Sequence, residues 1–174
     1  MTDARKFHIA LVVIAAIVLT IAAMAYKFIV VGSTAQGNDG RTVVLLTPEE
    51  RTFVLKEMRG FLAGVQKLSA ALANDDLQQA ANVARNMGSE AGAGEPAALM
   101  GKLPLEFKML GLSLHADFDR LAREADAKAA PKDLLRQLGG TLQKCVACHD
   151  RYQFGVAETR GAALEARESP RQQY

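Results

Sequence analysis

A short stretch near the C-terminal end, Cys145-Val146-Ala147-Cys148-His149, constrains this chain more than any other part of it. It has the C-x-x-C-H spacing that attaches a c-type haem through two cysteines. On a helix, residues three and four positions apart share a face, so both thiols and the imidazole would project from one side. The chain holds only two cysteines and three histidines. We therefore expect one covalently bound haem c, attached through Cys145 and Cys148, with His149 as an axial iron ligand.

Other uses of the two cysteines are weaker on the sequence. A thioredoxin-like pair needs a βαβ context, whereas the residues before Cys145 predict a helix with no strand ahead of it. A structural zinc site needs four ligands, and His115 is the only further histidine outside the N-terminal segment. A simple disulfide would not need His149. The disulfide and the redox dithiol remain the alternatives to haem attachment.

A long apolar run follows the first few residues. Residues 9–26 carry no charge, and residues 28–31 continue the run after Lys27. A helix of about 20 apolar residues crosses a bilayer. Arg5 and Lys6 precede the run, and positive residues stay on the cytoplasmic side. We expect residues 1–31 to be a single-pass anchor in the inner membrane, with the N-terminus in the cytoplasm and the rest of the chain in the periplasm.

The same residues 1–31 have features of a cleaved signal peptide. Their start is basic, and Ala23-Met24-Ala25 resembles an A-x-A cleavage site. The apolar run is longer than the roughly 7–15 residues of a usual signal core, and it resumes after Lys27, which favours a retained anchor. Both interpretations export the remainder of the chain.

Four amphipathic helical patterns occupy residues 47–155, after a small and polar segment, 32–46, that we expect to be a linker. The first helix begins with a capping box, in which Thr47 is the N-cap and Glu50 the third helical residue. Apolar residues then recur at steps of three and four, which predicts one buried face per helix. These faces hold Val54, Met58, Phe61, Val65, Leu68 and Leu72; Leu77, Ala80, Ala84 and Met87; Phe107, Leu110, Leu114, Phe118 and Leu121; and Leu135, Leu138, Leu142, Cys145, His149 and Tyr152.

Charge and composition restrict the classes of function that are expected for this chain. The formal net charge of +2 comes from the N-terminal segment, and acids and bases balance from Gly32 onward. No nucleic acid partner is therefore expected. The sequence also contains no nucleophile–base constellation and no phosphate-binding loop, so we expect no enzymatic activity.

Four amphipathic helices with C-x-x-C-H near the end of the last resemble the cytochrome c′ family. Residues 145–152, CVACHDRY, are similar to the way that family ends, and the resemblance covers residues 47–154 without the anchor, the linker or the tail. It implies an all-α fold, an antiparallel four-helix bundle, here preceded by a single transmembrane helix. The polar tail, residues 156–174, is expected to be disordered.

Within this family the sixth iron position decides the function. Low-spin members place a methionine there and transfer electrons, whereas high-spin members leave it empty and bind NO or CO. Matching the end of the first helix places Met58 at this position, and Met58 also lies on the periodic inner face. A methionine that only fills core space is the alternative. Other side chains are weaker candidates for the ligand: Met87, Met100, Met109 and His115.

Three further residues are candidates to surround the haem. Arginines pair with carboxylates such as the haem propionates, which makes Arg59 and Arg151 candidates, with a solvated surface position as the alternative for each. Tyr152 lies on the inner face and is expected to pack near the porphyrin.

These patterns predict a membrane-anchored monohaem c-type cytochrome that exchanges single electrons with redox proteins of a membrane electron-transport chain. Two alternatives stay open, namely a five-coordinate cytochrome c′ that binds NO or CO and a haem subunit of a larger membrane redox complex. The resemblance also implies a possible homodimer through the first two helices.

Overall fold

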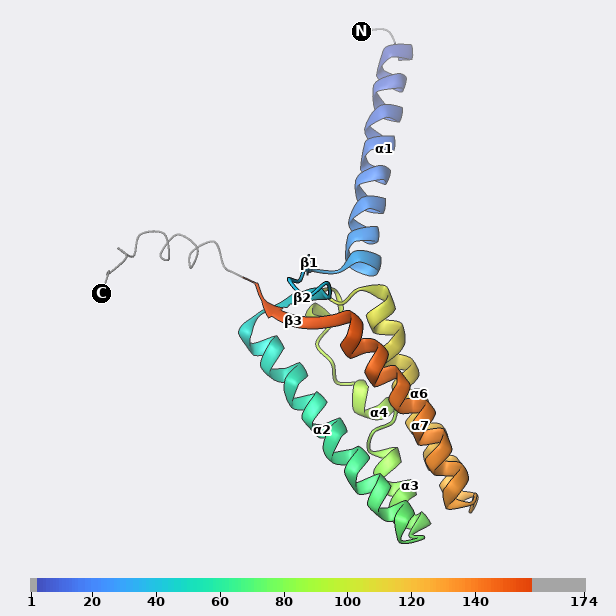
Figure 1. Cartoon of the computed structure of the whole chain (residues 1–174). Helices are drawn as coiled ribbons and strands as arrows, with labels where there is room; N and C mark the ends of the chain where they lie inside the picture. The colour runs from blue at the N-terminus through green and yellow to red at the C-terminus, as the bar shows by residue number, and fades with distance from the viewer. Residues whose placement is uncertain (1–2, 158–174) are drawn as a thin grey trace, which may run out of the picture.

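The N-terminal segment is one long apolar helix in the computed structural model, which describes residues 3–157 (Figure 1). Helix α1 (Asp3–Tyr26) continues into a π-helical segment, η1 (Lys27–Val31). The stretch Arg5–Val31 contains an exposed window with a mean hydropathy of 2.7, so its length and composition suffice to cross a membrane. A signal sequence meets the same criteria. Residues 158–174, most of the expected tail, lie outside the described residues.

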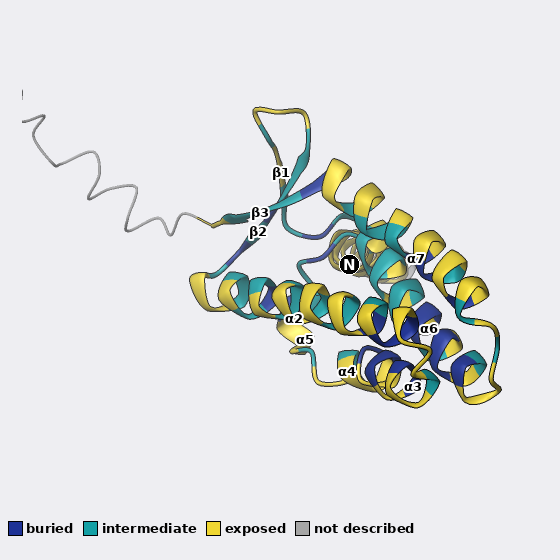
Figure 2. Ribbon diagram, turned by 60° about the horizontal axis from the view of Figure 1, so that its bottom comes forward, coloured by how far each residue is buried: buried dark blue, intermediate teal, exposed yellow. Residues whose placement is uncertain are grey.

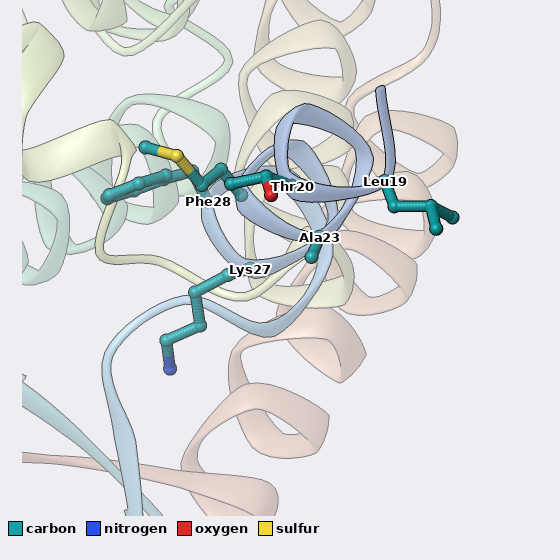
Figure 3. A pocket seen from close by; sticks show the side chains of 6 residues that line it. Leu19, Thr20, Ala23, Lys27 and Phe28 are labelled. Carbon is teal, nitrogen blue, oxygen red and sulfur yellow. The ribbon is translucent and has the colours of Figure 1, made fainter. Parts of the chain in front are cut away.

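An open pocket lies on the surface of this apolar helix, which we call the anchor after the role expected from the sequence, and it does not include the cysteine–histidine stretch (Figure 3). The Lys27 side chain extends from the helix there, and its Nζ donates to the Gly32 carbonyl oxygen at 2.6 Å. The pocket is lined by Leu19, Thr20, Ala23, Met24, Lys27 and Phe28.

The remaining helices run alternately away from the anchor and back towards it (Figure 1). In chain order they are α2 (Pro48–Ala73), α3 (Leu77–Arg85), the single-turn α4 (Ser89–Gly92) and α5 (Ala97–Met100), α6 (Leu105–Asp126) and α7 (Pro131–Arg151). Helix α3 packs against α2 and α6, and helix α7 also packs against both of them. The Phe61 ring of α2 stacks on the Phe118 ring of α6, with the centroids 5.9 Å apart. The fold is therefore mostly helical, as expected. The second predicted helix, whose apolar face was expected to extend to Met87, is α3, which has nine residues and ends at Arg85.

The larger apolar core lies at the end of the helices away from the anchor, where buried residues gather on α2, α3, α6 and α7 (Figure 2). Helix α3 packs closely because Ala80, Ala81 and Ala84 on its inner side are fully buried and small. The faces predicted for the first and third helices are confirmed. This core consists of Leu68, Ala71, Leu72, Ala80, Ala81, Val83, Ala84, Met87, Phe118, Leu121, Ala122, Ala125, Leu134 and Leu138.

The buried face of α7 differs from the predicted one. Leu134, Leu138 and Thr141 are buried, whereas Leu135 is 43% exposed and His149 is exposed. Leu138 belongs to both faces, whereas the buried positions Leu134 and Thr141 were not predicted. Thr141 was not expected inside because threonine is polar. Thr141 is tolerated inside because its hydroxyl donates to the Gln137 carbonyl oxygen at 3.2 Å.

A three-stranded sheet replaces the linker expected over residues 32–46 and corrects the all-α expectation. Strand β1 (Thr34–Gln36) pairs antiparallel with β2 (Thr42–Leu46), and β2 pairs in parallel with β3 (Tyr152–Val156). The apolar residues of β2 drive this, since Val44 and Leu46 are completely buried. The pairing supplies the backbone hydrogen bonds that a buried segment requires.

The predicted capping box of α2 is present. The Glu50 amide donates to Thr47 Oγ1 at 3.2 Å, and the Thr47 amide donates to Glu50 Oε2 at 2.8 Å. Lys102, between α5 and α6, adds an ion pair to Glu50 at 2.6 Å. Burial alone would raise the pKa of Glu50, but the bonds from Lys102 and Thr47 outweigh it and hold that pKa below 4.5.

Glu50→Gln is expected to lower the free energy of unfolding by about 1 kcal/mol at pH 7, because it removes the charge that Lys102 pairs with. A depressed carboxyl pKa stabilises the fold above the unfolded value of 4.5, and this contribution is lost as the pH falls through the folded pKa. Urea unfolding of both proteins across pH 7 to 3 measures it. Glu90→Gln, at an exposed carboxylate, is the control. A deficit that stays constant down to pH 3 would contradict the role of the charge.

Candidate functional site

The cysteine–histidine stretch occupies the last turns of α7, at the end of the domain nearest the anchor (Figure 1). Both thiols are free and half-buried, and the His149 side chain is exposed. Helix α7 ends directly afterwards, since Tyr152 is extended (φ −125°, ψ 151°) and begins β3. The helix therefore presents two thiols inward and an imidazole at the domain's edge.

A second apolar cluster, which we call the membrane-end cluster, lies beside the thiols. Cys148 packs against it, as do side chains from α2, α5, α6, β2 and β3. Phe107 organises its aromatic part, with ring centroids 5.4 Å from Tyr152 and 5.7 Å from Phe154 in edge-to-face geometry. Its buried members are Val44, Leu46, Val54, Leu99, Leu103 and Tyr152, and its partly buried members are Phe53, Met58, Met100, Phe107, Leu110, Cys148 and Phe154.

The methionine candidates separate into three places. Met58 on α2 packs against the membrane-end cluster, on a helix that contacts α7. Met100 on α5 packs against the same cluster. Met109 is 58% exposed, and Met87 belongs to the larger core away from the anchor. The structure thus brings Met58 to the cluster that Cys148 contacts, and it adds Met100, which sequence reasoning ranked low because it expected a loop there.

His115 is engaged elsewhere. Its Nδ1 donates to the carbonyl oxygens of Met87 and Gly88 at 2.9 and 3.0 Å, and its ring centroid lies 5.3 Å from that of Phe61. These contacts tie His115 to the segment that follows α3, which gives the residue a structural role.

The environment of the thiols bears on the alternatives to haem attachment. Burial raises the pKa of both thiols, and the neighbouring Cys145 helps raise the pKa of Cys148 to about 11. A reactive dithiol needs the opposite, a thiolate stabilised near neutral pH. Within residues 3–157 no three His, Cys, Asp or Glu side chains come together as a metal site, so a protein-only zinc centre gains no support there.

The two candidate arginines lie on the surface. Arg151 pairs with Glu106 at 2.6 Å, and its guanidinium lies 5.7 Å from the centroid of the Tyr152 ring. Tyr152 is buried, and its hydroxyl donates to the same Glu106 carboxylate at 3.3 Å. Arg59 is exposed on α2 and has no ion pair among the described residues. A role for either arginine towards haem propionates stays a prediction.

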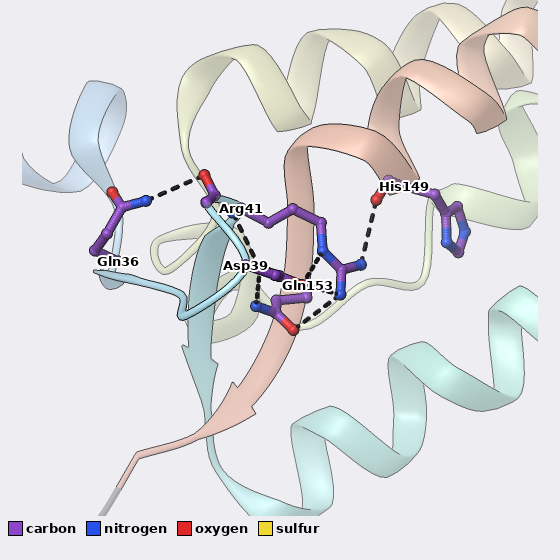
Figure 4. Close-up of polar contacts among 6 residues, drawn as sticks. Gln36, Asp39, Arg41, His149 and Gln153 are labelled. Atoms are coloured by element: carbon purple, nitrogen blue, oxygen red, sulfur yellow. Dashed lines mark hydrogen bonds and ion pairs between the residues drawn. The ribbon is translucent and has the colours of Figure 1, made fainter.

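Arg41 is a positioning residue that the sequence analysis missed. From the start of β2 it donates to the His149 carbonyl oxygen at 3.3 Å and to Gln153 Oε1 at 3.2 Å, and it pairs with Asp39 at 2.6 Å (Figure 4). The last carbonyls of a helix lack partners within it, so this guanidinium satisfies one of them and complements the helix dipole. The imidazole of His149 points away from this network (Figure 4). No local pattern links Arg41 to α7, because the contact joins opposite ends of the chain.

No protein-family profile, curated protein or solved structure matches this chain. The functional interpretation consequently depends on the residues themselves: a C-x-x-C-H stretch, a thioether on a facing helix, and an aromatic and aliphatic cluster that both contact.

Met58→Ala is expected to lower the free energy of unfolding by about 2 kcal/mol, because it removes a partly buried side chain from the membrane-end cluster. Met58→Leu keeps the volume and should cost less than about 1 kcal/mol. Thermal or urea unfolding of the chain without haem measures both. Met109→Ala, at an exposed position, is the control and should change stability little. Equal effects of Met58→Ala and Met109→Ala would contradict this packing.

Proposed function

We propose that this chain is a membrane-anchored monohaem c-type cytochrome that transfers single electrons on the periplasmic side of the inner membrane. One juxtaposition supports the proposal above all. Cys148, within C-x-x-C-H on α7, and Met58, on the neighbouring helix α2, pack against the same apolar cluster. Thiols and a thioether are thus available on facing elements around one region of the domain.

The residues present fit a covalently held haem. Two free, half-buried thiols stand one helical turn apart, which matches the two attachment points, and His149 follows them directly. The surrounding cluster consists of aromatic, aliphatic and methionine side chains, the kind that pack against a flat apolar group. When bound, the haem supplies an iron that cycles between the ferric and ferrous states.

Each residue has a distinct task in this proposal. Cys145 and Cys148 would hold the group through thioether bonds, and His149 and Met58 would supply ligands to its iron. Met/His ligation raises the reduction potential and leaves no open position for a gas. The membrane-end cluster excludes water, which also tunes the potential. No substrate is transformed, so the chain acts as an electron carrier and not as an enzyme.

The surroundings agree with a cytochrome c′-like domain at a membrane. Helices α2, α3, α6 and α7 pack in a cycle, the arrangement that a four-helix bundle requires. Arg5 and Lys6 lie in the first turn of α1, ahead of its uncharged run, which favours a cytoplasmic N-terminus and an exported domain. The partners in this proposal are redox proteins of a membrane electron-transport chain.

The full chain, expressed in a bacterium with c-type haem maturation, is expected to carry one haem that survives denaturing electrophoresis. Replacing both thiols, Cys145→Ser with Cys148→Ser, should abolish that covalent haem. The ferric absorption spectrum of the wild type should be low-spin with a Met–Fe charge-transfer band. Met58→Leu should retain the covalent haem and lose this band.

Met100→Leu is the matched control, since Met100 packs against the same cluster, and it should leave the spectrum unchanged. Loss of the band in Met100→Leu alone would reassign the ligand to Met100. A high-spin ferric wild type whose reduced form binds CO rapidly would overturn electron transfer in favour of gas binding. A chain without covalent haem would overturn the proposal as a whole.

A further inference from the structure

The junction between anchor and domain contains no free linker. η1 ends at Val31, and the next two residues are already held by the domain. The Ser33 amide donates to the Lys102 carbonyl oxygen at 2.7 Å, and the Ser33 carbonyl oxygen accepts from the Leu45 amide at 2.8 Å. β1 then begins at Thr34. The chain thus enters the sheet within three residues of the membrane-spanning segment.

Gly32 makes this junction tight. Its φ of +69° is in the left-handed region, which glycine adopts without strain. A Cβ built there would lie 2.8 Å from the Leu103 carbonyl carbon and from the Pro104 nitrogen, and it would clash with the Lys102 carbonyl oxygen. The backbone entering the domain is therefore pressed directly against the start of α6.

The anchor itself also contacts the domain. Lys108 on α6 donates from Nζ to the carbonyl oxygens of Phe28 and Ile29, each at 3.2 Å. These are among the final carbonyls of η1, which have no partners within the helix. η1 and α6 pack side by side there. The anchor is consequently attached at two places, through the backbone at Ser33 and through Lys108.

The cysteine–histidine stretch is fastened to the same structure. α7 runs straight into β3, which pairs with β2 from Tyr152 opposite Thr42, and Arg41 holds the His149 carbonyl oxygen. At a helical rise of 1.5 Å per residue, Cys145 lies only about 9 Å along α7 from the end of the helix. The anchor, the sheet and the last turns of α7 thus form one connected unit at the membrane end of the domain (Figure 1).

We propose that the β1–β2–β3 sheet acts as a rigid collar, by which we mean that it holds the domain in one orientation on the anchor. The Cys145–His149 site is thereby fixed next to the membrane, so that this site exchanges electrons with a redox protein embedded in the same membrane. The partner assignment rests on the proposed function. One electron passes and no atom moves, so the site is oxidised by one electron as the partner's centre is reduced, or the reverse. A flexible segment as long as residues 32–46 would span about 20 Å and let the domain turn towards a soluble carrier. Attachment of the anchor to the sheet and to α6 prevents this rotation of the domain.

The collar is tested on the full chain in lipid nanodiscs, by time-resolved fluorescence anisotropy of a dye on an unnatural amino acid at Gln78, exposed on α3. The collar variant combines a ten-residue Gly-Ser insertion between Val31 and Gly32 with Lys108→Met. The control carries the same insertion between Asn38 and Asp39, exposed at the β1–β2 turn. The residual anisotropy should fall at least twofold in the collar variant and stay near the wild-type value in the control. Wild-type anisotropy as low as that of the collar variant would overturn the collar.

The partner class is tested with two oxidants of matched chemistry, a ferrocenium group carried on a phospholipid headgroup and soluble ferrocenium carboxylate. Each accepts one electron from the reduced haem protein. The rate with the lipid-held oxidant should fall severalfold in the collar variant, and the rate with the soluble oxidant should not change. Equal rates in wild type and collar variant with both oxidants would overturn the assignment to a membrane-embedded partner. A chain without haem would overturn that assignment with the proposed function, whereas the anisotropy still decides the collar by itself.

Discussion

The parallel pairing of β2 with β3 is the constraint on which the rest of the structure depends. It closes a loop that contains every helix of the domain, and loop-closure entropy opposes it. Burial of Val44 and Leu46 offsets that cost, since both are completely inside. The same pairing defines where α7 ends, because Tyr152 must leave the helix to enter the sheet. The position of the cysteine–histidine stretch follows from this one contact.

The two apolar clusters of the domain differ in the side chains that form them. The larger core, away from the anchor, packs small alanines of α3 against leucines and Phe118, which brings helices close and makes them rigid. The membrane-end cluster uses aromatic rings and two methionines, whose side chains adapt to an irregular or inserted partner. The tightly packed core thus lies away from the anchor, and the half-buried thiols lie at the opposite end, near the membrane-end cluster.

Local signals could be predicted from the sequence, and contacts between distant segments could not. The capping box at Thr47 and Glu50 is a pattern within four residues, and it is present as expected. The buried face of α7 was predicted only in part, because burial of Thr141 depends on its bond to Gln137 and hydropathy does not reveal that bond. Arg41 carries no signal at all, since its role exists only where β2 meets the end of α7.

The sequence by itself determined the residue chemistry and some local structure: two thiols and an imidazole at C-x-x-C-H spacing, an apolar stretch long enough to cross a membrane, and the capped start of α2. These depend on residue type and short-range spacing. Only the tertiary structure decided how deeply the thiols lie, which methionines pack against the cluster that Cys148 contacts, and that residues 32–46 supply two strands of a sheet. These depend on packing and hydrogen bonds between segments far apart in the chain, which no local periodicity encodes.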